Sequence, residues 1–200
     1  MNNTNPFIYS DDNKRYHTLN YYNKSSFNSK VFKAVIDAGF TCPNKDGTKG
    51  TGGCIYCMGG SGYFTEKSDG EIYDSVKRQL AAEKERIYKK HPDSLITAYF
   101  QANTNTYAPV ATLKEAYTAA LDFGVHGISI GTRADCLPDD VIALLCDINS
   151  KTHLTVELGL QTIHDKSAQI INRCYTYDEF LEGYRKPVSY THLTLPTIRL

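Results

Sequence analysis

The sequence predicts an α/β fold built from parallel βαβ units. Four short segments rich in β-branched and apolar residues alternate with segments that have helical spacing of apolar residues. A long glycine-rich loop with three cysteines separates the first strand from the first helix. The 200 residues are 41% hydrophobic, which is enough for a folded core and too much for a disordered chain.

The first expected strand is the partly β-branched segment 31–40. Residues 1–30 before it are polar and tyrosine-rich, and we expect them to form an irregular lead-in. Residues 41–62 after it carry seven glycines, so regular structure is not expected there. Loops of this length in compact chains are usually functional or disordered, and the cysteines favour function.

Residues 70–90 are expected to form a helix. Asp69 is a candidate cap, and Glu71 near the start and Lys89 near the end both suit the helix dipole. Glu83 interrupts an apolar stripe and should narrow the buried face. The stripe consists of Ile72, Val76, Leu80 and Ile87. Pro92 should end the helix.

Three more strand–turn–helix patterns follow. The capping-box pattern Thr112-x-x-Glu115 predicts a helix start, and Gly124 a stop after Phe123. Pro138 and the two aspartates after it open the next helix, which runs to Ile148. The remaining expected strands are 95–100, 127–131 and 154–160, and residues 165–172 should again be helical.

Charge and hydropathy exclude several classes of protein. The net charge is zero and neither half is strongly basic, so the chain lacks the electrostatic signature of a nucleic-acid binder. No apolar run reaches the roughly 18 residues of a membrane span, and the polar N-terminus has no signal-peptide core. We therefore expect a cytoplasmic protein without membrane contact, whose six cysteines are thiols, metal ligands or catalysts rather than disulfides.

The strongest chemical signal is the group Cys42, Cys54 and Cys57, spaced Cys-x11-Cys-x2-Cys in the glycine-rich loop. Three thiolates are one short of the four that fill an ordinary iron–sulfur cluster, which would leave one iron open. A zinc site completed by a fourth ligand such as His17 fits the same spacing. A thioredoxin-like redox pair fits less well, because it leaves Cys42 unexplained.

The amino-acid sequence of the loop, GFTCPNKDGTKGTGGCIYC, resembles the cluster loop of radical S-adenosylmethionine (SAM) enzymes. The resemblance extends from about Tyr21 to Lys186 through the motifs FQANTNTYAP, SIGTRADCLPD and VELGLQTIHDK. It indicates an uncharacterised bacterial family related to the Elongator catalytic subunit and to coproporphyrinogen dehydrogenase. It implies a TIM-like (β/α)6 barrel of radical SAM type, truncated here after about four βα units.

The resemblance also implies a set of ligands. Cys42, Cys54 and Cys57 would hold three irons of a [4Fe–4S] cluster, and SAM would chelate the fourth. Tyr56 would lie near the adenine, and Gln161 and Arg173 match a glutamine and an arginine that contact SAM in related enzymes. Glu157 matches the Elongator-like VELG pattern. Gln101 and Thr104 follow the second strand, where related enzymes bind the methionine amino group.

The activity implied is reductive cleavage of SAM followed by hydrogen abstraction from a substrate, which the Elongator-like resemblance suggests is a tRNA base. The electron would come from a donor such as flavodoxin or ferredoxin. The alternative is a zinc-stabilised binding module without SAM chemistry. Cys136 follows the third strand and could touch substrate, whereas Cys146 lies in an apolar run and should be core.

The last thirteen residues, VSYTHLTLPTIRL, do not continue the pattern of strands and helices. They resemble a translated sequencing-adapter sequence, and Pro187 should break the preceding helix. We therefore expect residues 1–30 to be a lead-in, 31–187 the radical SAM core, and 188–200 a non-native tail.

Overall fold

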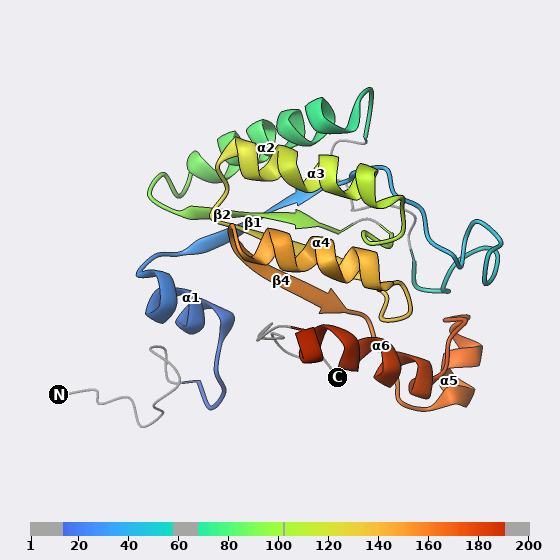
Figure 1. Cartoon of the computed structure of the whole chain (residues 1–200). Helices are drawn as coiled ribbons and strands as arrows, with labels where there is room; N and C mark the ends of the chain where they lie inside the picture. Colours follow the sequence, from blue (N-terminus) through green and yellow to red (C-terminus); the bar gives the residue numbers. More distant parts are fainter. Residues whose placement is uncertain (1–13, 58–67, 102, 191–200) are drawn as a thin grey trace.

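Four parallel strands form the centre of the molecule, and helices cover one of their faces (Figure 1). The computed structural model describes residues 14–57, 68–101 and 103–190. The strands are β1 (Val31–Ile36), β2 (Leu95–Phe100), β3 (Gly127–Thr132) and β4 (His153–Leu158), and they lie side by side in chain order. The helices are α1 (Leu19–Phe27), α2 (Ile72–Tyr88), α3 (Val110–Phe123), α4 (Asp139–Asn149), α5 (Asp165–Ile170) and α6 (Tyr177–Tyr190).

The strand order and the helices between the strands confirm the predicted α/β fold. Each strand pairs in parallel with the next, so all carboxyl ends meet at one edge. Sequential parallel order is the arrangement of a partial TIM-like barrel. The segment 95–100 coincides with β2, while the other strands are close to their predicted positions.

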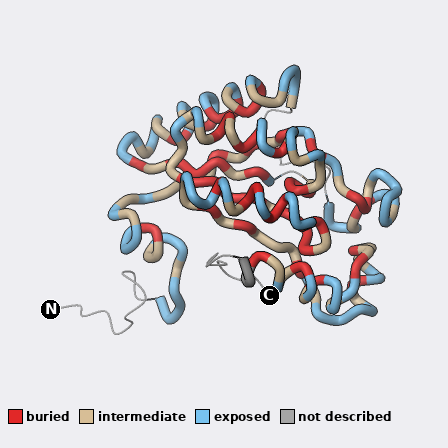
Figure 2. The backbone as a smooth tube through the Cα atoms, viewed as in Figure 1, coloured by how far each residue is buried: buried red, intermediate tan, exposed pale blue. Residues whose placement is uncertain are grey.

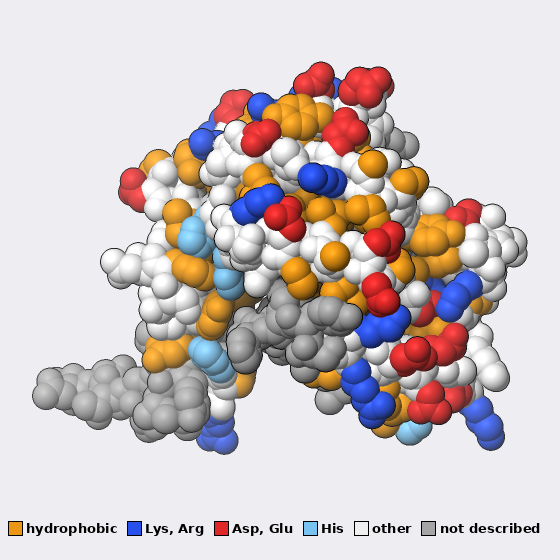
Figure 3. Space-filling view, in the orientation of Figure 1, with side chains coloured by type: hydrophobic (Ala, Val, Ile, Leu, Met, Phe, Trp, Pro, Cys, Tyr) orange, Lys and Arg blue, Asp and Glu red, His pale blue; other side chains and the backbone are white. Residues whose placement is uncertain are grey.

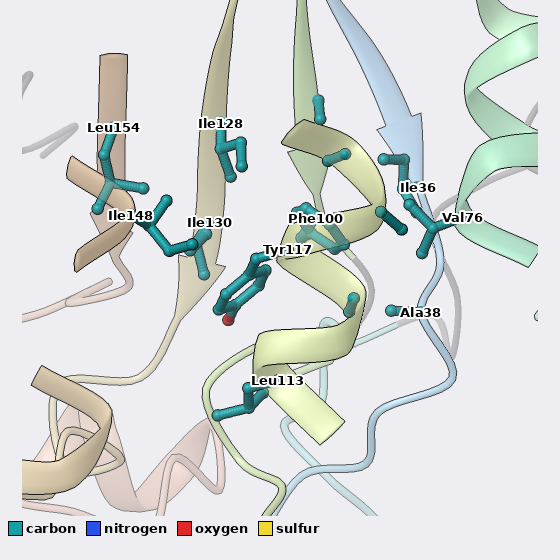
Figure 4. Packing of buried hydrophobic residues seen from close by; sticks show 14 of the residues in the cluster. Ile36, Ala38, Val76, Phe100, Leu113, Tyr117, Ile128, Ile130, Ile148 and Leu154 are labelled. Carbon is teal, nitrogen blue, oxygen red and sulfur yellow. The ribbon is translucent and has the colours of Figure 1, made fainter. Parts of the chain in front are cut away.

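The core lies between the sheet and helices α2, α3 and α4 (Figures 2 and 4). Alternate strand residues such as Ile36, Phe100 and Ile130 point toward the helices and are fully buried. The ring of Tyr117 on α3 meets Phe100 edge-on, with 5.2 Å between ring centres. The helices are therefore held by apolar packing against one face of the sheet.

The opposite face of the sheet is curved. Strands β1 and β4 are separated by two others, which in a flat sheet would put them roughly 14 Å apart at the usual strand spacing. Even so, the ammonium of Lys33 on β1 contacts the carboxylate of Glu157 on β4. Such a contact requires a concave face, as in the wall of a barrel.

Helix α2 supports the end of β1 with polar side chains. The buried amide of Gln79 accepts a hydrogen bond from the Asp37 backbone N–H at 2.9 Å and donates one to the Asp37 carbonyl at 2.8 Å. Glu83 was expected to narrow the buried face of α2, but it is itself buried and forms an ion pair with Arg86 at 2.7 Å. The point where the chain leaves β1 for the cysteine loop is thereby anchored.

The irregular lead-in predicted for residues 1–30 is wrong for its second half, because α1 is a helix. Thr18 caps it by accepting a hydrogen bond from the Tyr21 N–H at 3.1 Å. Phe27 packs its ring 4.4 Å from that of His126 and 5.1 Å from that of His153, at the amino ends of β3 and β4. Figure 3 shows histidine side chains grouped on this side of the molecule. Residues 1–13 lie outside the described residues.

Several predicted helix boundaries are also corrected. The residue before the first turn of α3 is Pro109, so Thr112 lies inside the helix and the predicted capping box does not form. Glu71 rather than Asp69 precedes α2, without a side-chain cap.

Pro187 does not break α6, since the helix continues to Tyr190 although a proline has no N–H to donate to the carbonyl four residues before it. Residues 188–190 of the predicted tail thus continue the helix, and residues 191–200 lie outside the described part of the chain. The predicted non-native origin of the tail stays a prediction. No helix among the described residues is long and apolar enough to cross a membrane.

The contact between α6 and the loop after β3 yields a stability prediction. A methyl group at Gly183 would overlap the carbonyl oxygen of Ala134. We expect Gly183→Ala to destabilise the fold by about 2 kcal/mol through overpacking, lowering Tm by roughly 5 °C for a domain of this size. The neighbouring exposed Glu182→Ala is the control. Equal thermal melting of the two variants would contradict the close packing of α6.

Candidate functional site

The cysteine loop begins at the carboxyl end of β1 and is ordered by its own backbone. The carbonyl of Cys42 accepts hydrogen bonds from the N–H groups of Lys45 at 2.8 Å and Asp46 at 3.1 Å, which makes a tight turn. A second turn brings Cys54 and Cys57 together, since the N–H of Cys57 donates to the carbonyl of Cys54 at 2.9 Å. Over residues 41–57 the predicted loop is therefore irregular but well connected, and residues 58–62 lie outside the described part of the chain.

The segment after α5 holds the loop from the other side. Asn44 is fully buried and donates to the carbonyl of Asn172, and its amide lies 3.5 Å from the sulfur of Cys54. Asn172 donates in return to the carbonyl of Gly53 at 2.8 Å. A Cβ at Gly50 would overlap the side chains of Asn44 and Cys174, so a larger residue here would force both of them to move. Two segments more than one hundred residues apart thus interlock.

An ion network ties the loop to the barrel, and we call its four residues the Asp135 latch. The guanidinium of Arg133 donates to both oxygens of Asp135, at 2.9 and 2.8 Å. Lys49, between Cys42 and Cys54 in the chain, contacts the same carboxylate at 2.7 Å and reaches Glu179 of α6 at 3.5 Å. The Asp135 side chain is only 5% exposed, so the pairing is largely shielded from water.

The pKa shifts of Asp135 and Lys49 are those expected for ion-paired groups. Burial by itself would raise the pKa of Asp135, but hydrogen bonds from Arg133 and Lys49 outweigh it and hold the pKa below its usual value. Burial likewise opposes the charge of Lys49, yet the hydrogen bond to Asp135 raises its pKa. All charges of the latch are therefore present at neutral pH.

The three predicted ligand thiols are free. Cys42 and Cys54 are partly buried, and Cys57 is exposed. Burial, and next the hydrogen bond with the Cys54 thiol, raise the pKa of Tyr56, so the predicted adenine contact lies beside this cysteine. The donor set fits an iron–sulfur centre with one open iron in type and number. Among the described residues, however, no three ligand side chains are gathered closely enough to hold a metal ion.

Arg173 and Gln161, the pair implied by the resemblance to radical SAM enzymes, come together. The guanidinium of Arg173 is 1% exposed and donates to the carbonyls of Leu160 and Thr162, each at 2.6 Å. These carbonyls flank Gln161, whose φ of 60° is unusual for a residue other than glycine. Arg173 also donates twice to the carbonyl of Tyr175. Its observed role is to hold the turn that carries Gln161, and the contact of either residue with SAM stays a prediction.

The other predicted site residues lie elsewhere. Glu157 sits on the concave face, where it contacts Lys33 and accepts a hydrogen bond from the Tyr99 hydroxyl at 2.9 Å. Gln101 is exposed just beyond β2, and its backbone N–H donates to Ile36 at 3.3 Å. Thr104 is buried, and its N–H donates to Thr41 beside Cys42 at 3.2 Å. Their predicted contacts with SAM stay predictions.

Cys136 has the environment of an inert thiol. It is 7% exposed, and burial raises its pKa to about 12, so it stays protonated at neutral pH. A cavity of about 960 Å³ lies next to it, between the cysteine loop, the first turns of α3 and α4, and α6. Cys146 packs against the core from α4, in agreement with prediction.

Sequence reasoning missed Lys49, Asp135 and Lys33 as contributors to the site. Lys33 carried a visible signal, because a lysine within an apolar strand needs a partner. Lys49 and Asp135 carried none, since charged loop residues are ordinarily solvated.

Comparison with known proteins gives the family. The Radical SAM superfamily model matches residues 46–190, most of the chain, and the chain therefore belongs to this superfamily. It is similar to an uncharacterised protein of Bacillus subtilis, YtqA, with 48% identity over 188 residues, covering 93% of this chain and 57% of YtqA.

Two further relatives come from distant organisms. Protein YhcC of Escherichia coli is 38% identical over 153 residues, covering 76% of this chain and 47% of YhcC. The uncharacterised protein MJ0486 of Methanocaldococcus jannaschii is 33% identical over 171 residues, covering 82% of this chain and 50% of MJ0486. The chain spans about half the length of these relatives.

The latch can be tested with Asp135→Asn, which keeps the shape of the side chain but removes its charge. We expect a loss of stability on the order of 3 kcal/mol, because two cations lose a shielded partner, and faster reaction of the loop thiols with Ellman's reagent. Asp147→Asn, in the exposed Lys151–Asp147 pair at 2.7 Å, is the matched control. Equal thiol reactivity in the two variants would contradict the latch.

The same pair of variants gives a pH prediction. Since the pKa of Asp135 is lowered in the folded state, its stabilisation is present above the unfolded carboxyl pKa of about 3.9 and is lost as pH falls through the lower folded value. The difference in unfolding free energy between wild type and Asp135→Asn should be constant from about pH 5 to 8 and shrink in stronger acid. Urea denaturation at several pH values measures it.

Proposed function

We propose that this chain is part of a radical SAM enzyme, in which Cys42, Cys54 and Cys57 hold three irons of a [4Fe–4S] cluster and SAM occupies the fourth. The observation that carries the proposal is a loop with three free thiols at the carboxyl end of β1, in a chain of the Radical SAM superfamily. Active sites of parallel barrels are built at this edge.

When bound, the cluster would supply one electron to the sulfonium of SAM and so start hydrogen abstraction from a substrate. The chain's own residues support the site around it. The Asp135 latch keeps the loop against the barrel, and the interlock of Asn44 with Asn172 holds the segment before Cys54. Arg173 orients the turn of Gln161, which follows β4 at the same edge of the sheet.

The proposal includes two partners. The electron for the cluster would come from a one-electron donor such as flavodoxin or ferredoxin, because the chain's own thiols are too weak as reductants to reduce the cluster. The substrate suggested by the Elongator-like resemblance is a tRNA base. The neutral charge of this chain means that tight RNA binding would need basic surface from outside it.

Anaerobic reconstitution with ferrous iron and sulfide tests the cofactor. We expect about four irons per chain, a brown colour that bleaches on reduction with dithionite, and an altered electron paramagnetic resonance spectrum when SAM is added. Cys57→Ala should lose the cluster, whereas Cys146→Ala, which removes a thiol outside the loop, should keep it.

The competing outcome is equally concrete. Stoichiometric zinc, retained during iron reconstitution and accompanied by no SAM cleavage after reduction, would indicate a zinc-stabilised binding module and overturn the proposal.

A further inference from the structure

The concave face of the sheet is unusually polar for the inside of a barrel. Barrel interiors are ordinarily filled by layers of bulky branched side chains. Here the strand positions turned away from α2, α3 and α4 carry mostly polar, charged or absent side chains. The polar or small ones are Lys33 on β1; Thr97 and Tyr99 on β2; Gly127, Ser129 and Gly131 on β3; and His153, Thr155 and Glu157 on β4. The apolar positions on the same face are Val31 and Val35 on β1 and Leu95 on β2.

Three of these side chains converge from three strands, and we call them the interior cluster. The Lys33 ammonium contacts one oxygen of Glu157 and lies 3.8 Å from the centre of the Tyr99 ring. The Tyr99 hydroxyl donates to the other oxygen of Glu157 at 2.9 Å. The cluster is well organised without belonging to the apolar core.

Glycine at position 131 makes this convergence possible. Gly131 pairs with Glu157 across β3 and β4, and a Cβ there would lie 3.9 Å from the Tyr99 hydroxyl and 3.3 Å from the Phe100 carbonyl. A longer side chain would stand between Tyr99 and Glu157. The glycine thus keeps the space between Tyr99 and Glu157 free of a third side chain.

The cluster is also accessible. The side chains of Lys33 and Glu157 are each 33% exposed. An ammonium has three N–H donors and a carboxylate about four acceptor positions, and the contacts described use one donor of Lys33 and two acceptor positions of Glu157. A donor and an acceptor thus remain side by side in the partly exposed Lys33–Glu157 pair.

We propose that the interior cluster is a substrate-binding site that takes a neutral planar group with an N–H beside a C=O, as in a lactam or a cis amide. The N–H would donate to Glu157 and the carbonyl would accept from Lys33. A neutral group suits the site because the Lys33–Glu157 pair already balances its own charge. A charged group would have to break that pair and leave one ion without a partner.

That the bound group is a substrate rests on the proposed function, but binding to the interior cluster needs neither iron nor SAM. Uracil is a suitable probe because it presents N–H groups beside carbonyls. The matched control ligand is 1,3-dimethyluracil, which keeps the ring and the carbonyls and lacks both N–H groups. Saturation-transfer NMR on the chain without iron or SAM measures both, so failure of the radical SAM proposal leaves this result interpretable.

We expect uracil to bind with a Kd on the order of 1 mM, typical of a small ligand held by few hydrogen bonds, and dimethyluracil to bind at least tenfold more weakly. Lys33→Met and Glu157→Gln should each weaken uracil binding at least fivefold. Lys151→Met, in an exposed ion pair on α4 and the turn after it, should leave binding unchanged.

Tyr99→Phe is the conservative variant should the other two fail to fold. It keeps the ring in place and removes only the hydroxyl that orients Glu157, so we expect a smaller loss of uracil binding. Equal binding of uracil and dimethyluracil, no detectable uracil binding, or wild-type affinity in a folded Lys33→Met or Tyr99→Phe protein would overturn the proposal. A purely structural ion pair would instead change Tm in these variants without any binding of uracil to wild type.

Discussion

The carboxylate of Asp135 is the contact on which the arrangement of the candidate site depends. It joins the loop after β3 to the cysteine loop through Lys49, and Lys49 continues the link to α6. Because the side chain of Asp135 is almost fully buried, these charges are poorly screened and their geometry is specific. Together with the backbone turns at Cys42 and Cys54 and the Asn44–Asn172 interlock, this contact holds a loop with many glycines in one conformation.

The two faces of the sheet differ in polarity, and this difference separates the packing of the helices from the proposed binding site. The face toward α2, α3 and α4 is apolar and holds the helices, whereas the concave face is mostly polar and leaves Lys33 and Glu157 partly exposed. The alternation of side chains along each strand makes this division possible, since neighbouring residues such as Lys33 and Ala34 serve opposite faces. Curvature then brings polar groups from non-adjacent strands into contact, as between Lys33 and Glu157.

Local sequence signals failed where tertiary packing overrides them. The Thr112 capping box was plausible, but Pro109 supplies the start of α3 one turn earlier. Pro187 was expected to break a helix, but α6 continues through it to Tyr190. In α1, the cap at Thr18 was a readable signal, while the packing of Phe27 against two histidines was not. Tertiary contacts decide whether a weak local preference is used.

The sequence by itself determined the alternation of strands and helices, their approximate bounds, the family resemblance and the three cysteines, because periodicity and spacing are local properties of a chain. The family resemblance also pointed to Gln161 and Arg173 as a pair. Only the tertiary structure decided that Arg173 holds the backbone on both sides of Gln161, that Asp135 secures the cysteine loop, and that Glu157 faces Lys33. These contacts join residues distant in sequence, and such partners become neighbours only once the sheet curves and its loops meet at one edge.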